Sequence, residues 1–149
     1  MDKFEEYKLF SDRTLQHSQR RQNASQIYLT VNTAIFSVMA LLIRDSGLRG
    51  WNLVLASIPL FLVGLLASAV WIMIIARFKK LIGWYYEQLR EMEEEIKGSY
   101  KFYTKEWISF SQKSRTSFSD LEAFMPKIFI GLYLIYAIGM ILAVKYGFL

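Results

Sequence analysis

Three long apolar runs constrain this chain more than any other feature. They cover residues 27–43, 51–76 and 128–144, and none of them contains Asp, Glu, Lys, Arg or His. A helix that crosses a hydrocarbon core of about 30 Å needs roughly 17 to 25 predominantly apolar residues. Hydrophobic residues also make up 54% of the 149 residues, more than an ordinary soluble domain carries. We therefore predict an all-α integral membrane protein with transmembrane helices at 27–43, 51–76 and 127–146.

The basic residues are distributed unequally across these spans. Of the 18 Lys and Arg residues, all but Arg44, Arg49 and Lys145 precede the first span or lie between the second and the third. Lys and Arg concentrate in the cytoplasmic loops of membrane proteins. We therefore expect a cytoplasmic N-terminus, a cytoplasmic long loop and an external C-terminus. This topology accounts for the net charge of +5 without nucleic acid, which we do not expect as a partner.

The first span is predicted to extend into the cytoplasm. Residues 1–26 contain no Gly or Pro, so they can form an amphipathic helix continuous with the span. The whole helix would be about 65 Å long at 1.5 Å per residue. Residues 44–50 then form a short external turn that leads into the second span.

The second span is predicted to continue as a cytoplasmic amphipathic helix over residues 77–97. Apolar side chains recur there at helical spacing: Phe78, Leu81, Ile82, Tyr85, Leu89, Met92 and Ile96. The pairs Arg90–Glu94 and Glu93–Lys97 are expected on its solvent side. The two long helices would form an antiparallel hairpin. Because each extension has a single apolar stripe to bury, we expect a homo-oligomer.

Residues 98–126 form an aromatic and basic segment that we expect at the headgroup level of the bilayer. Its aromatic cluster consists of Tyr100, Phe102, Tyr103, Trp107 and Phe110. The alternative is that these aromatic side chains form a ligand pocket. Further along, the spacing of Ser119 and Glu122 predicts a capping box that starts a short helix. Pro126 would end that helix or open the third span as its first residue.

A seam of polar side chains runs along the first helix into the membrane. We call it the polar stripe, and it consists of Gln19, Asn23, Gln26, Thr30, Thr33 and Ser37, spaced alternately by four and three residues. Polar groups inside lipid must face other protein or water. One interpretation is helix packing, in which hydroxyls and small residues allow close approach and interhelical hydrogen bonds. The other is a lumen, in which several copies of the helix line a water-filled path.

Small residues on the other spans favour packing. Gly64 and Ser68 on the second span, and Gly139 and Ala143 on the third, are pairs spaced by four residues. Such pairs let membrane helices approach closely.

Basic side chains also gather where the first two spans are expected to enter the cytoplasm: Arg20, Arg21, Arg77, Lys79 and Lys80. They could bind an anionic lipid or a nucleotide, or they could only anchor the topology. Catalysis is not expected, because the chain has no Cys, one His and no Gly-rich phosphate loop. We predict no cofactor and no metal site.

The stretch SDRTLQHSQRRQNASQIYLTVNTAIFSVMALLI resembles the opening of the RipA-type octameric membrane proteins of bacteria. Their pattern of polar residues falls on Ser18, Arg20, Arg21, Gln22, Ala24 or Ser25, and Asn32, Thr33 and Ala34. Further matches are Trp71, Glu106, Trp107, Glu122 and Pro126. The linker IKGSYKFY departs from the Leu-Pro of that family. In layout the chain is also similar to SLATT membrane effector domains.

The resemblance implies a multi-pass protein of the bacterial inner membrane that forms a homo-oligomer, and the expected assembly is the octamer of that family. Two functions follow from it and from the polar stripe. The first is a channel or pore-forming effector, gated from the cytoplasmic side in a defence or stress context. The second is a non-conducting scaffold that presents a cytoplasmic helical crown to a protein partner.

Overall fold

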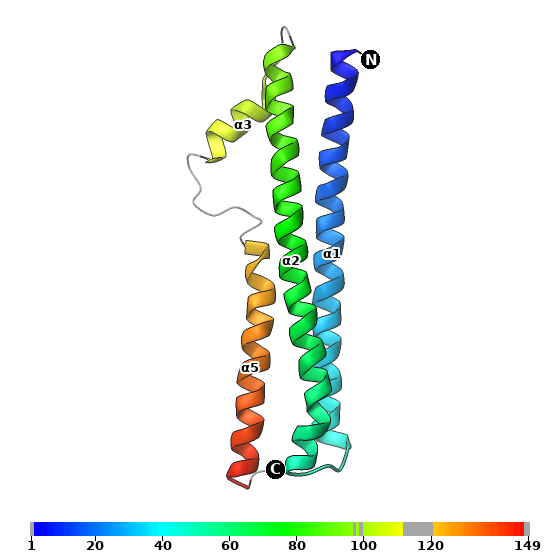
Figure 1. Cartoon of the computed structure of the whole chain (residues 1–149), viewed down its shortest axis with the longest axis vertical. Coiled ribbons are helices and arrows are strands. Elements are labelled where there is room, and N and C mark those ends of the chain that lie inside the picture. Colours follow the sequence, from blue (N-terminus) through cyan, green and yellow to red (C-terminus); the bar gives the residue numbers. More distant parts are fainter. Residues whose placement is uncertain (1, 97, 99, 112–120, 148–149) are drawn as a thin grey trace.

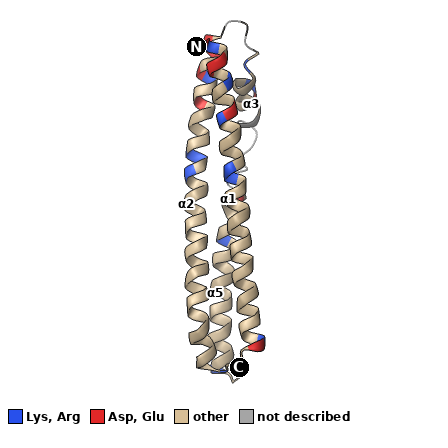
Figure 2. Cartoon of the chain, turned by 90° about the vertical axis from the view of Figure 1, so that its right-hand side faces the viewer, with Lys and Arg blue, Asp and Glu red and all other residues tan. Residues whose placement is uncertain are grey.

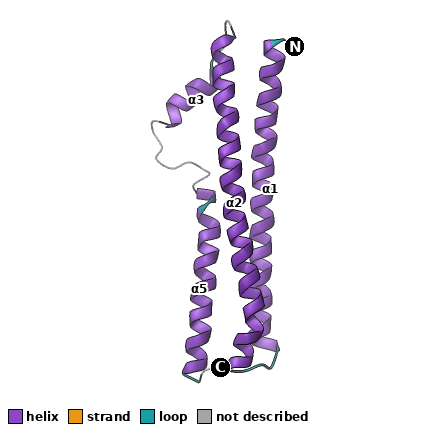
Figure 3. Cartoon of the chain, in the orientation of Figure 1, coloured by secondary structure: helices purple, strands orange, loops and turns teal. Residues whose placement is uncertain are grey.

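The computed structural model describes residues 2–147 with the exception of residues 97, 99 and 112–120. The described residues form helices and no strands. The helices are α1 (Lys3–Asp45), α2 (Trp51–Glu95), α3 (Phe102–Ser111) and α5 (Phe124–Lys145). The helices α1 and α2 stand side by side in opposite directions, and α5 runs along the half of α2 that follows the turn (Figure 1). The short helix α3 leans on the far end of α2 (Figure 3).

The two long helices are continuous because little in their sequence interrupts them. The 43 residues of α1 include no Gly or Pro, and the helix ends just before Gly47 and Gly50, whose φ values are +67° and +58°. Only glycine adopts such a backbone without strain. Pro59 lies inside α2 and removes one backbone hydrogen bond, which membrane helices tolerate.

Three of the described helices are long and apolar enough to cross a membrane, namely α1, α2 and α5. Most charged residues lie toward the end of the long pair that is distant from the turn between α1 and α2, near the N-terminus and the end of α2 (Figure 2). The apolar parts of α1 and α2 therefore lie level with α5. The rest of the long pair extends beyond α5 as two helices.

The core of the membrane-crossing half lies where three helices meet. Ile35 and Met39 of α1 and Tyr133 of α5 form a buried cluster. The ring of Tyr133 stacks on Phe36, with ring centroids 4.5 Å apart, and it lies against Gly64 of α2. A side chain at Gly64 would overlap this ring, so the glycine is what lets α5 approach α2.

The core of the other half is a single stripe between α1 and α2. Ile82 and Leu89 are buried there, in agreement with the predicted apolar spacing. Glu93 is also fully buried, so the prediction that placed it on the solvent side was wrong. Its carboxylate accepts hydrogen bonds from α3 and α1, as described below, and Lys97, its predicted partner, lies outside the described residues.

The helix α3 is held at a point on α2 well beyond the apolar run. Its contact is Glu93, and the helix from Ala76 to Glu93 covers about 25 Å at 1.5 Å per residue. The aromatic residues of α3 therefore pack on the distal part of α2, because Glu93 fixes the helix there. The expected position of this segment at the headgroup level stays a prediction.

The entry into α5 differs slightly from the prediction. The helix begins at Phe124, so Pro126 is its third residue rather than its first. A proline is tolerated anywhere in the first turn, because those backbone amides have no partner within the helix. Ser119, the first member of the predicted capping box, lies outside the described residues.

Candidate functional site: the polar faces of α1 and α2

The membrane-crossing part of α1 carries polar side chains on two faces. Asn32 points toward the other helices and is fully buried. Thr30 and Thr33 point away from them and are exposed. These faces have different partners and are described in turn.

Asn32 joins the three membrane-crossing helices. Its side-chain oxygen accepts a hydrogen bond from the hydroxyl of Ser68 on α2 and another from the hydroxyl of Tyr133 on α5, each 3.0 Å long. Its side-chain amide donates to the backbone carbonyl of Tyr28 at 2.8 Å. Asn32, Ser68 and Tyr133 are fully buried. An unpaired buried polar group costs about 1–3 kcal/mol, so this group of three side chains, the Asn32 node, holds α5 on the long pair.

Above the Asn32 node, Trp71 of α2 continues the contact with α1. Its indole nitrogen donates to the hydroxyl of Ser25 at 3.3 Å, and its ring stacks on Tyr28 with centroids 6.2 Å apart. These contacts bring together residues that the sequence resemblance had singled out separately.

The polar stripe lies on the outside of the unit formed by the described helices. All six of its residues are exposed: Gln19, Asn23, Gln26, Thr30, Thr33 and Ser37. The hydroxyls of Thr30, Thr33 and Ser37 each donate at 2.9 Å to the backbone carbonyl one turn earlier. Their protons are therefore satisfied within α1, while their oxygens can still accept a hydrogen bond.

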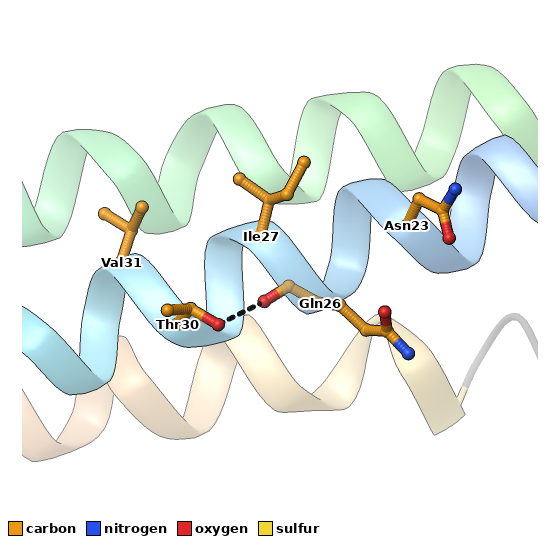
Figure 4. Close-up of a pocket in the computed structure, with 5 residues that line it drawn as sticks. All are labelled: Asn23, Gln26, Ile27, Thr30 and Val31. Carbon is orange, nitrogen blue, oxygen red and sulfur yellow. Dashed lines mark hydrogen bonds between the residues drawn. The ribbon is translucent and has the colours of Figure 1, made fainter.

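Part of the stripe borders a shallow open depression on α1. Figure 4 shows Asn23, Gln26, Ile27, Thr30 and Val31 around it. The depression is too open to enclose a ligand by itself. Any partner for this face has to come from outside the described part of the chain.

The two pairs of small residues have different surroundings. Gly64 and Ser68 are buried against α5 and α1. Gly139 is exposed with no atom within 4 Å of its potential Cβ, and Ala143 is half-buried. Gly64 and Ser68 thus pack inside the chain, whereas Gly139 faces outward.

The structure brings the five basic residues of the predicted anion site to one level along the long pair. The contact between Ser25 and Trp71 places Arg20 of α1 level with Arg77 of α2, since the helices are antiparallel. Arg21 points inward, and its Nε forms an ion pair with Oε2 of Glu122 at 3.0 Å. The two atoms are not aligned as a hydrogen bond. Arg20, Arg77, Lys79 and Lys80 are exposed.

A second buried polar group lies near the far end of the long pair. The carboxylate of Glu93 accepts hydrogen bonds from the backbone amides of Tyr103 and Thr104 at 2.9 and 3.0 Å. It also accepts from the hydroxyl of Thr104 at 2.8 Å and from the hydroxyl of Tyr7 at 3.0 Å. The two amides belong to the first turn of α3, where backbone donors lack helical partners. Glu93 therefore caps α3 from another helix, and we call this arrangement the Glu93 node.

The Glu93 node shifts the acidity of both its ionisable side chains. Burial by itself raises the pKa of Glu93, but the hydrogen bonds from Tyr103, Thr104 and Tyr7 outweigh it and hold the pKa below its usual range. Burial and the neighbouring carboxylate raise the pKa of Tyr7. At neutral pH Glu93 is thus an anion and Tyr7 a neutral donor.

Sequence reasoning missed the roles of Asn32 and Glu93. Asn32 was noticed only as part of a family pattern, and Glu93 as a surface charge. A signal did exist for Glu93, because it lies four residues after Leu89 on the apolar stripe. Its donors lie on two other helices, and spacing along one helix cannot reveal them.

Together these features describe a helical chain with three helices long and apolar enough to cross a membrane, which buries two polar nodes and leaves a polar face of one of those helices uncovered. The chain belongs to the octameric membrane protein family (8xMP), whose model matches residues 4–142. Membership in this family implies self-association, as the earlier resemblance to octameric membrane proteins did. No curated protein and no solved structure matches the chain.

Proposed function

We propose that copies of this chain form a ring in the membrane, with the polar stripes of α1 around a water-filled path for ions or small solutes. One observation carries the proposal: the stripe is exposed along a spanning helix, and none of the described helices of the same chain covers it. In contrast, the outward side chains of α2 and α5 are large and apolar. Leu62 and Leu66 are 62% and 66% exposed, and Ile135 is 69% exposed. Such surfaces suit lipid, whereas the stripe suits water.

A ring of eight α1 helices would leave an opening along its axis for geometric reasons. All copies enter the membrane with the same orientation, so their symmetry axis lies along the membrane normal and the ring closes by rotation. Neighbouring helices pack with axes about 10 Å apart. Eight α1 axes then lie on a circle of radius at least ~13 Å, and subtracting a helix radius of about 5 Å leaves an opening of about 8 Å radius. Eight helices cannot fill this axis by themselves.

The proposal includes an orientation and a means of control. The excess of Lys and Arg in the N-terminal part and between α2 and α5 supports a cytoplasmic N-terminus and an external C-terminus in a bacterial inner membrane. The level of Arg20, Arg77 and Lys80 would then be the inner mouth. A positively charged mouth attracts anionic lipid or a phosphate-bearing ligand, so we propose gating from the cytoplasmic side. We propose no catalytic step and no cofactor.

Thiol accessibility tests the lumen directly, since the chain contains no cysteine. Single cysteines would replace Thr30, Thr33 or Ser37, with Ile35, which is buried, as the control on the same helix. The assembled protein in proteoliposomes would be treated with a charged thiol reagent that does not cross membranes. We expect the three stripe positions to react and Ile35 to stay unmodified. Unreactive stripe positions in an intact octamer would overturn the lumen.

Conductance provides the second readout. With a lumen, Ser37→Asp should shift the selectivity of the current toward cations without changing the octamer, because it adds a ring of carboxylates to the path. The same substitution at Gly83, which is exposed on α2 outside the apolar run, should leave the selectivity unchanged.

A non-conducting scaffold is the second candidate. It is favoured by the hydrogen bonds of Thr30, Thr33 and Ser37 within α1, which allow these side chains to pack in a dry interface. A scaffold would present the distal helices and α3 to a protein partner. It predicts that substitutions in the stripe alter assembly, and that no current passes through the assembled protein.

A further inference from the structure

The helix α3 exposes apolar side chains in a region that lies beyond the apolar runs of α1 and α2. Phe102 is 57% exposed and Ile108 is 53% exposed. Trp107 is 54% exposed although Arg90 stacks on its ring at 4.3 Å. Because α3 begins about 25 Å beyond the apolar run of α2, we take these side chains to lie outside the lipid when the helix is held at Glu93. A cluster of large apolar side chains in water usually marks an interface.

A second uncovered face runs along α1 beside the polar stripe. We call it the flanking face, and it consists of Leu9, Arg13, Arg20, Ile27, Val31 and Val38, which recur at helical spacing and are all exposed. Figure 4 shows two of its members, Ile27 and Val31, on the side of α1 nearer to α2.

The flanking face and α3 lie on opposite sides of the subunit. The hydroxyl of Ser11 is hydrogen-bonded to that of Tyr103 on α3 at 2.9 Å, so Ser11 faces the α3 side. Leu9 precedes Ser11 by two residues, which corresponds to a rotation of about 200° around the helix axis. Figure 1 shows α3 and α5 on one side of α2, and α1 on the other.

The two faces also lie at the same level along the membrane normal. Tyr103 at the start of α3 contacts Ser11, within one turn of Leu9 and Arg13 on α1. Rotation about an axis along the normal preserves this level. When the polar stripes face that axis, the α3 side of each copy therefore meets the flanking face of the next copy.

We propose that α3 of one copy packs on α1 of the next copy around the ring, with Phe102 against Leu9 and Glu106 facing Arg13, since the two residues on each helix lie four positions apart on one face of that helix. The apolar side chains that α3 leaves exposed would be covered, and the exposed charges of Glu106 and Arg13 are complementary. The contact is heterologous, because two different surfaces meet, and such contacts close into rings. This inference rests on the orientation of the stripe in the proposed function, although it does not require conduction.

Cross-linking between separately tagged copies tests the contact. One copy would carry Leu9→Cys and the other Phe102→Cys, co-expressed and treated in membranes with a short bifunctional thiol reagent. We expect a cross-linked dimer that carries both tags. The matched control is Leu15→Cys with Phe102→Cys, since Leu15 is 60% exposed but is rotated by about 240° from Leu9. It should give little or no product, as should Phe102→Cys alone.

A charge exchange supplies an independent readout. Glu106→Arg should lower the fraction of octamer in native mass spectra at least several-fold, and Arg13→Glu in the same chain should restore it. Either a stronger product with Leu15 than with Leu9, or no product in an intact octamer, would overturn the contact. Quenching of Trp107 fluorescence by spin-labelled lipid would also overturn it, because α3 would then lie on the bilayer. Thiol labelling at Thr33 reports on the lumen separately, so failure of this contact and failure of the proposed path are distinguishable.

Discussion

The Asn32 node and the Glu93 node attach a third helix to the same long pair, but they use different chemistry. In the membrane-crossing half, a neutral amide accepts two hydroxyl hydrogen bonds and holds α5. In the distal half, a carboxylate accepts hydrogen bonds from Tyr7 and from the first turn of α3. Both side chains are fully buried, so burial alone does not explain the choice of residue.

The difference follows from the surroundings of each node. A charged side chain at the centre of a bilayer costs about 2.5–3.5 kcal/mol or more. A neutral amide beside lipid therefore destabilises the fold less than a carboxylate would. Outside the membrane, water beyond the node reduces that cost. A carboxylate there also gains from the charge-assisted hydrogen bonds of a helix N-terminus. The contrast predicts that charge should be excluded from one node and required at the other.

Asn32→Asp should have the largest effect on this contrast. It places a carboxyl group where Ser68 and Tyr133 already donate, in the membrane-crossing half, and should destabilise the folded subunit by about 3 kcal/mol. Unfolding in mixed detergent micelles would measure the loss. Asn23→Asp is the matched control, since Asn23 lies on the same helix but is exposed; it should change stability by about 0.5 kcal/mol at most. Equal effects of the two substitutions would contradict the claim that the Asn32 node excludes charge.

Gly64→Ala should have the next largest effect, because it disturbs the packing around the Asn32 node. The added methyl group overlaps the ring of Tyr133 and moves the hydroxyl away from Asn32. Overpacking of this kind costs about 1–3 kcal/mol. Gly83→Ala on the same helix meets no atom within 4 Å and should stabilise α2 by about 0.5–1 kcal/mol. The same unfolding measurement would compare them, and a neutral Gly64→Ala would contradict the close approach of α5.

Glu93→Gln should have a smaller and more local effect. The amide keeps one acceptor but loses the charge, so the cap of α3 should weaken by about 1 kcal/mol. Faster hydrogen exchange at the first turn of α3, with unchanged exchange in α5, would report it. The neighbouring Glu94→Gln changes an exposed side chain and serves as the control. Unchanged exchange in both variants would mean that the charge of Glu93 does not hold α3.

The sequence predicted the framework of this molecule better than its two nodes. The apolar runs lie within α1, α2 and α5, because a run without charges constrains a helix by composition alone. Asn32 is flanked by Val31 and Thr33, and nothing in that order reveals that Ser68 and Tyr133 donate to it. Glu93 was assigned to solvent because a carboxylate in a charged stretch usually is exposed. Both errors concern partners distant in sequence, which periodicity along one helix does not contain.

Acid should release α3 selectively. We expect this effect to be smaller than those of the three substitutions. The hydrogen bonds of the Glu93 node hold the pKa of Glu93 below its ordinary value of 4.5. The docked form therefore binds fewer protons than the released form, so docking is fully favoured above pH 4.5 and weakens as the pH falls through the lowered pKa. Tyr7 does not contribute in this range, because its raised pKa keeps it protonated.

A spin label on Ser109, which lies on the exposed side of α3, would follow the release in an otherwise cysteine-free chain. We expect a restricted label at neutral pH and a mobile one at about pH 3, below the ordinary range of a glutamate. In Glu93→Gln the mobility should be the same at both pH values, because the group that titrates is gone. If the label in Glu93→Gln still becomes mobile in acid, another carboxylate controls α3, and the charge of Glu93 serves only to cap the helix.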